Sequence, residues 1–185
     1  MVPPISTRWH SALSSPRGFA IASGLTLGVA LLTILLAGYT FRVLTAPPPL
    51  LGEPVPYPSS THVPDGALGP NPGLTPAGGH HYARPLPTGI YPSPVTDGHA
   101  IHSLAHGIVW LTYQPDQISD AELDTLEAIA ADFPVDTILA PRLENSFPVI
   151  VVSWEQRLTM EHLDEQALRD FVSTNRNRSP EPGVR

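Results

Sequence analysis

The pattern of hydrophobic and polar positions divides the chain into three main parts. Residues 19–41 form a run of 23 residues without a charged side chain. Residues 44–98 are rich in Pro and Gly and show neither a strand period nor a helix period. Residues 99–178 combine short apolar runs with segments of helical periodicity, which is the pattern of a folded domain. Residues 179–185 follow as a C-terminal tail.

The apolar run predicts a single transmembrane helix over residues 19–43. A helix of 23 residues measures about 34 Å, which is enough to cross a hydrocarbon core of about 30 Å. The run is longer than the apolar part of a signal peptide. Arg8 and Arg17 precede it and Arg42 alone follows. The positive-inside rule therefore places residues 1–18 in the cytoplasm and the main domain on the periplasmic or extracellular side of the cell membrane.

Small residues recur every four positions near the start of this helix, at Ala20, Gly24 and Gly28. Such spacing lets two helix backbones approach closely, which favours a contact with another membrane helix. The alternative is that Gly and Ala are simply frequent in membrane helices.

The segment of residues 44–98 is predicted to be an extended arm. Fourteen prolines lie between residues 47 and 94, and proline is excluded from helix interiors and central strands. Polyproline conformation and turns are expected instead. An ordered arm of this kind must lie on its own domain or on a neighbouring subunit.

The part that follows the arm is predicted to be an α+β domain over residues 99–178. A histidine-bearing turn at residues 98–107 leads into it, and Ser119 and Glu122 form a capping box that opens its first helix. Residues 175–185 are expected to fray. The order β-α-β-β-α comes from strands at 108–113, 135–140 and 148–154 and helices at 119–133 and 163–172.

Composition and charge exclude several classes of function. Residues 51–185 carry seven Arg and seventeen Asp or Glu, and this acidic balance argues against nucleic acid as a partner. The chain has no Cys and no Lys, which excludes disulfides, thiolate metal sites and Schiff-base chemistry. The motifs of zinc proteases, serine hydrolases and P-loop proteins are absent from the sequence. No complete catalytic set is found, and the protein is expected not to be an enzyme.

Histidines are the residues with the clearest chemical potential. His102 and His106 lie four residues apart, a spacing that puts both on one face of a helix or of a strand. With His81 and His62 from the arm they would form a set of nitrogen ligands for Cu or Zn. The alternative is structural, because histidines beside a turn can hydrogen-bond backbone carbonyls and hold the arm in place. The roles of His80 and His99 stay open.

Several motifs resemble the bacterial domain-of-unknown-function family 3105 (DUF3105). The similarity covers about residues 57–182 and rests on T-H-V-P-D-G at 61–66, P-x-G-G-x-H-Y at 76–82, H-S-L-x-H-G at 102–107 and V-V-S-W at 151–154. The resemblance implies a membrane anchor, an extracytoplasmic domain and paired histidines. Members usually have Glu where this chain has Ala105, and often Ser where it has Gly78. The resemblance implies no activity, since the function of the family is not established.

Two functions are consistent with these features. The first is a non-catalytic accessory subunit of a larger membrane complex, respiratory or photosynthetic, with other membrane-protein subunits as partners. It is motivated by the small-residue helix, the arm and the missing catalytic set. The second is an extracytoplasmic protein that binds or delivers Cu or Zn through the four histidines.

Overall fold

The computed structural model describes residues 16–183, with side chains from residue 24 onward, and divides the chain into two compact units. The first unit contains the helix α2 (Pro16–Thr45). Its stretch Gly24–Thr45 is long and apolar enough to cross a membrane, a property it shares with signal sequences near an N-terminus. Of the segment predicted to be cytoplasmic, residues 1–15 lie outside the described residues.

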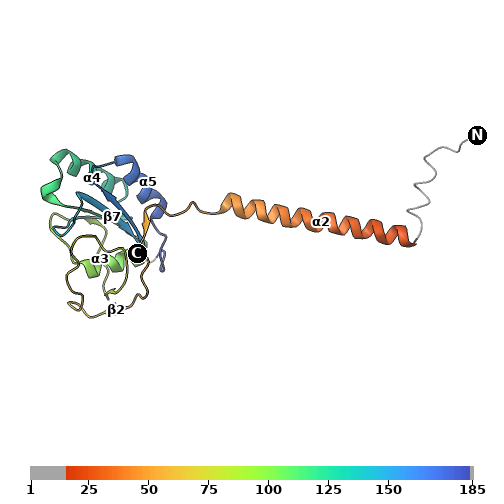
Figure 1. The fold of residues 1–185 in the computed structure, drawn as a ribbon, viewed down its shortest axis with the longest axis horizontal. Helices are drawn as coiled ribbons and strands as arrows, with labels where there is room; N and C mark the ends of the chain where they lie inside the picture. The colour runs from red at the N-terminus through yellow and green to blue at the C-terminus, as the bar shows by residue number, and fades with distance from the viewer. Residues whose placement is uncertain (1–15, 184–185) are drawn as a thin grey trace, which may run out of the picture. The chain divides into compact units, whose positions relative to one another are not determined.

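The second unit, Pro49–Arg185, is built on a six-stranded sheet with the order β1-β8-β7-β5-β6-β4. Its centre is nearly continuous in Val, Ile and Leu because helices or the arm cover both faces (Figure 1). β6 runs parallel to β5 and β4, and the other pairs are antiparallel. The strands are β1 (Glu53–Pro54), β4 (Gly89–Ile90), β5 (Val109–Tyr113), β6 (Thr137–Pro141), β7 (Val149–Ser153) and β8 (Gln156–Met160).

Helices α4 (Asp120–Asp132) and α5 (Glu165–Asn175) cover one face of the sheet. The predicted capping box is present: the Ser119 hydroxyl accepts a hydrogen bond from the N–H of Glu122, and the Glu122 carboxylate accepts one from the N–H of Ser119. The apolar side chains of both helices pack on alternate residues of β5 and β7. The short 3-10 helix η1 (Pro115–Gln117) connects β5 to α4.

Helix α3 (Asp97–Ala105) and the Pro-rich arm cover the opposite face. The turn predicted at residues 98–107 is therefore wrong, because most of this segment is helical. Seven of the nine residues of α3 are buried. Its apolar side, with Ala100, Ile101 and Leu104, packs into the core, and its polar side, with His102 and Ser103, packs on the arm. Its Gly and His residues are weak helix formers. Packing against Trp110 and Ile150 stabilises it instead.

The α+β class is confirmed, and so are the strands predicted at 108–113, 135–140 and 148–154, which correspond to β5, β6 and β7. Strand β8 was not predicted. It pairs with β7, and a tight turn at Glu155 connects the two strands. The φ of Glu155 is 56°, which is unusual for a residue with a side chain.

The arm lies on its own unit. Short segments of it, β1 and β4, form the two edges of the sheet, where prolines are tolerated. The N–H of Val55 donates to the carbonyl of Glu155 at 2.9 Å, and the Arg157 side chain donates to the carbonyl of Thr75 at 3.0 Å. These contacts account for the order of the arm without a neighbouring subunit.

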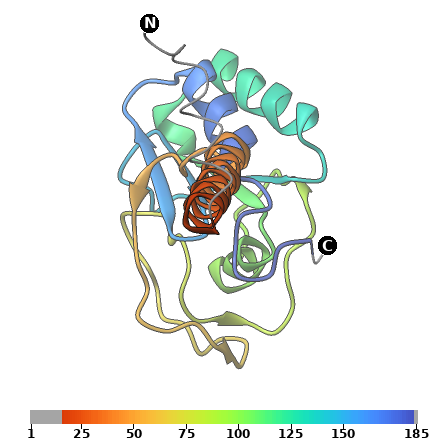
Figure 2. The same cartoon turned by 90° about the vertical axis from the view of Figure 1, so that its right-hand side faces the viewer.

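The C-terminal segment also packs on this unit, so the predicted fraying is wrong for its described residues. Figure 2 shows the segment after α5 returning beside α3. The N–H of Asn177 donates to the carbonyl of Gly107 at 2.7 Å, and the N–H of Glu181 donates to the carbonyl of Ala105 at 3.0 Å. The segment of residues 177–183 therefore follows the C-terminal end of α3.

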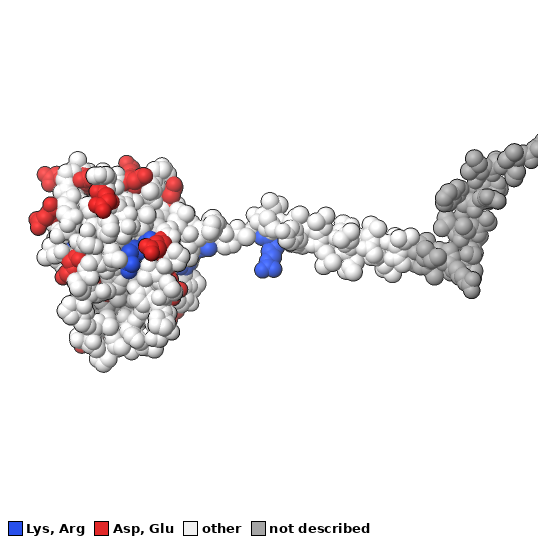
Figure 3. Space-filling view, viewed as in Figure 1, with Lys and Arg blue, Asp and Glu red and all other residues white. Residues whose placement is uncertain are grey.

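Acidic side chains are concentrated on one side of the unit. On the face shown in Figure 3 they gather over α4 and α5, whereas the surface around β2 (His62–Val63) carries few charges. Helix α4 contributes Asp120, Glu122, Asp124, Glu127 and Asp132. The helices that cover the face opposite α3 thus carry seven of the seventeen acidic residues of the chain.

Candidate metal centre

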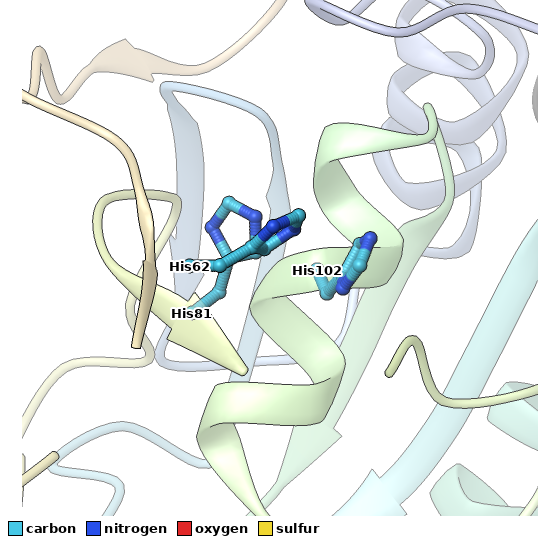
Figure 4. Close-up of side chains that lie close together, drawn as sticks. All are labelled: His62, His81 and His102. Carbon is cyan, nitrogen blue, oxygen red and sulfur yellow. The ribbon is translucent and has the colours of Figure 1, made fainter. Parts of the chain in front are cut away.

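Three elements bring histidines together. β2 pairs in parallel with β3 (His81–Tyr82), and the register sets His62 opposite His81. Helix α3 packs against β3 and carries His102. The ring centroids of the three histidines lie 4.8–4.9 Å apart, and one potential ligand atom from each lies within 4.8 Å of the others (Figure 4).

A glycine allows β3 to approach α3 this closely. A Cβ atom at Gly98 would meet the ring of Tyr82 at 2.6 Å, well inside an ordinary van der Waals contact. The next turn of α3 is also tied to the arm, because the Ser103 hydroxyl donates to the carbonyl of Leu86 and accepts from its N–H. The helix ends in a Schellman motif at Gly107, with φ of 87°. These contacts thus fix β3, which carries His81, relative to α3, which carries His102.

Hydrogen bonds fix which nitrogen each buried ring presents. Nδ1 of His102 lies 2.7 Å from the carbonyl oxygen of Tyr82, and Nδ1 of His81 lies 2.9 Å from that of Gly79. A carbonyl only accepts, so each Nδ1 carries the proton and donates it. In the neutral rings, Nε2 therefore holds the lone pair. A backbone carbonyl that orients a ring in this way is the usual support of a metal-binding histidine.

Burial keeps these two rings neutral. It lowers the pKa of His81 and of His102 below the ordinary value of 6.5, because loss of water disfavours the charged imidazolium. The hydrogen bonds to Gly79 and Tyr82 raise the pKa by less, and the neighbouring histidines lower it further. Both rings are therefore neutral near pH 7, the form in which imidazole binds a metal ion.

His106 stands at the edge of this group. It is the C-cap of α3, and its Nε2 lies 3.1 Å from Nε2 of His102. The same atom lies 3.4 Å from a carboxylate oxygen of Glu181. A cavity of about 430 Å³, lined mainly by apolar residues, borders His106 on the side of Ile108 and Leu86. His106 thus connects the three-histidine group to the C-terminal segment and to this cavity.

The three-histidine group fits a metal ion after a small contraction. A Zn–N bond measures about 2.0–2.1 Å, so two nitrogens on one tetrahedral ion lie about 3.3 Å apart. The potential ligand atoms lie within 4.8 Å of one another, so some pairs must close by up to roughly 1.5 Å. His62 is exposed and belongs to a strand of only two residues, so it has room to make this movement.

The predicted site residues therefore have different positions. His62, His81, His102 and His106 lie together, as the sequence suggested. His80 and His99 are directed elsewhere: His80 contacts Thr61 and Ser59, and His99 contacts the carbonyl of Arg84 and the carboxylate of Asp65. On α2, a Cβ at Gly24 or Gly28 would meet no atom within 4 Å, and the side chain of Ala20 lies outside the described residues.

Sequence reasoning missed the groups that support the histidines. The carbonyls of Gly79 and Tyr82 carry no side-chain signal. The Gly79 carbonyl lies two residues before His81, and the Tyr82 carbonyl becomes a partner of His102 only when β3 meets α3. Glu181 lies in a segment that was expected to fray and is 75 positions beyond His106 in the chain. The Pro and Gly residues around Glu181 gave no indication of this contact.

The family model described as "Protein of unknown function (DUF3105)" matches residues 72–185, which is more than half of the chain. The match includes three of the four histidines of the site and the C-terminal segment. No curated protein and no solved structure gives a match.

Proposed function

Because the chain belongs to the DUF3105 family, whose function is not established, we propose a function from the site itself: a membrane-anchored protein that binds Cu or Zn through His62, His81 and His102. Helix α2 would serve as the anchor. His106 stands beside the three ligands. The proposed location of the site is outside the cytoplasm, following the distribution of Arg around the helix.

The observation that carries this proposal is the orientation of the two buried rings. His81 and His102 each use Nδ1 for a backbone carbonyl, so the lone pair of each neutral ring is on Nε2. The structural role considered for the histidines is thus present at Nδ1, and it leaves Nε2 for a ligand. Two oriented neutral imidazoles beside an exposed third form a nearly complete ligand set.

The type of ligand indicates the type of metal. Imidazole nitrogen suits Cu and Zn, whereas Ca²⁺ and Mg²⁺ take oxygen ligands. His62 is exposed, so an ion bound there would be open to solvent on one side. This opening is suited to the transfer of an ion to or from a partner, and it leaves a coordination position for water or a partner's ligand.

Metal content provides the test. The full-length protein would be purified in detergent with an affinity tag that contains no histidine, stripped with a chelator, and incubated with Cu²⁺ or Zn²⁺. After removal of free metal, mass spectrometry should find one equivalent in the wild type. The His62→Ala variant should lose most of it, and because His62 is exposed its fold should be unchanged.

His80→Ala is the matched control, since His80 neighbours His81 in the chain but has its ring directed to Ser59 and Thr61. This variant should retain the metal. If the wild type retains neither ion, or if a His62→Ala/His102→Ala double variant retains as much as the wild type, the proposal is wrong.

An accessory role in a membrane complex is the second candidate, and α2 supports it. The apolar side chains of this helix from Leu25 to Leu44 are exposed, and Gly24 and Gly28 leave open space on its surface. The ordered arm no longer supports this candidate, because the arm packs on its own unit. Chemical cross-linking in native membranes should give a defined larger species that is lost in a Gly24→Leu/Gly28→Leu variant. If the variant gives the same cross-linked species as the wild type, the accessory role through this helix face is contradicted.

A further inference from the structure

The proton on His106 can be located from its neighbours. Nδ1 of His102 donates to the carbonyl of Tyr82, so Nε2 of neutral His102 can only accept. Nε2 of His106 lies 3.1 Å from that atom, and a hydrogen bond between them requires His106 to carry the proton on Nε2. Without a metal ion, the N–H of His106 therefore covers the lone pair of His102.

This arrangement has a consequence for metal binding. His102 needs the same lone pair to coordinate an ion, so the N–H of His106 must leave it when the ion binds. A buried N–H without a partner is unfavourable by an amount comparable to a lost hydrogen bond. The side chain of His106 is only 13% exposed, so water is a limited replacement. The site thus requires a second acceptor close to Nε2 of His106.

The C-terminal segment supplies a suitable acceptor. A carboxylate oxygen of Glu181 lies 3.4 Å from Nε2 of His106. The backbone N–H of Glu181 donates to the carbonyl of Ala105, and that of Asn177 donates to the carbonyl of Gly107, so the segment is attached on both sides of His106. The side chain of Glu181 is half exposed and has room to approach.

We propose that Glu181 is a positioning residue of the metal site: when an ion binds His102, the N–H of His106 turns from His102 to the Glu181 carboxylate. The carboxylate then holds His106 away from the lone pair and places a negative charge near the cation. The C-terminal segment is thereby part of the site, although none of its residues is a ligand in the proposed set. This inference rests on the proposed function.

The test measures affinity in the full-length protein in detergent, by competition with a chromophoric chelator for Zn²⁺ and, in parallel, for Cu²⁺. Glu181→Ala removes both acceptor and charge and should weaken binding by about 10- to 100-fold, as the loss of a hydrogen-bond partner of a metal site usually does. Glu181→Gln keeps an acceptor oxygen and should weaken metal binding by a smaller factor than Glu181→Ala does. Asp124→Ala, which removes an exposed carboxylate of α4, is the control and should bind as the wild type does.

A double-mutant cycle with His106→Ala separates this role from a general effect on the fold. If Glu181 acts mainly through His106, Glu181→Ala should cause a much smaller loss in the His106→Ala background, where only the effect of its charge remains. Equal loss in both backgrounds, or wild-type affinity in Glu181→Ala, would overturn the inference and leave the metal site standing. Absence of metal binding in the wild type itself would overturn the proposed function together with the inference.

Discussion

Gly107 is the position at which the contact between α3 and the C-terminal segment can be measured. Its φ is 87°, in the left-handed region, and an added Cβ would lie 2.6 Å from Cα of Asn177. Gly66 has nearly the same φ, 84°, but a Cβ there would meet no atom within 4 Å. The substitutions Gly107→Ala and Gly66→Ala therefore share a conformational cost and differ in one steric contact.

The expected magnitudes follow from these geometries. A left-handed alanine costs about 1–2 kcal/mol at either position, and the effect of alanine on the unfolded chain is the same for both. At Gly107 the atoms that must move belong to the backbone of Asn177, so rotation of a side chain cannot relieve the overlap. Overpacking of this kind adds about 1–3 kcal/mol. Gly107→Ala should therefore lower the free energy of unfolding by about 2–5 kcal/mol.

The measurement is urea-induced unfolding of the full-length protein in detergent, followed by near-UV circular dichroism. A chain that ends at Arg176 provides the matched background, because it lacks Asn177 and the rest of the segment. In this shortened chain, Gly107→Ala should lower the free energy of unfolding by no more than Gly66→Ala does. Equal losses for the two substitutions in the full-length chain would refute the packing of the C-terminal segment on α3.

Three further predictions test other parts of the structure. Burial lowers the folded-state pKa of His81 and His102, so below about pH 6.5 the unfolded chain binds more protons than the folded one. The free energy of unfolding without metal should therefore fall as the pH is lowered from about 7.5 to about 5. A free energy of unfolding that stays constant over this range would contradict the prediction. Ser119→Ala removes the N-cap of α4 and should cost about 1 kcal/mol in urea unfolding, whereas no loss would argue against the capping box. Asn175→Ala removes the hydrogen bonds from the Asn175 side chain to the N–H and the carbonyl of Leu51. It should lower the free energy of unfolding by at least about 2 kcal/mol. A loss below about 0.5 kcal/mol, the size of a neutral surface substitution, would contradict this.

The cluster of histidines was only partly predictable from the sequence. The spacing of His102 and His106 is a local signal, and it holds on the last turn of α3. The participation of His62 and His81 was proposed from their positions in the arm, but their contact depends on the parallel pairing of β2 with β3. That pairing joins two-residue strands in a Pro-rich segment, where no periodicity marks a strand.

The local pattern of residues determined the elements that carry their own signal: the apolar helix α2, the capped helix α4, the amphipathic helix α5 and the buried strands β5 and β7. Each has a period or a cap within about 15 residues, because its neighbours in sequence are also its neighbours in space. Tertiary structure decided the rest. Helix α3 is stabilised by contacts on both of its sides, the Tyr82 carbonyl orients the ring of His102 only when the arm reaches α3, and Glu181 approaches His106 only after the chain returns from α5. Contacts of this kind join residues far apart in sequence, and no local pattern records them.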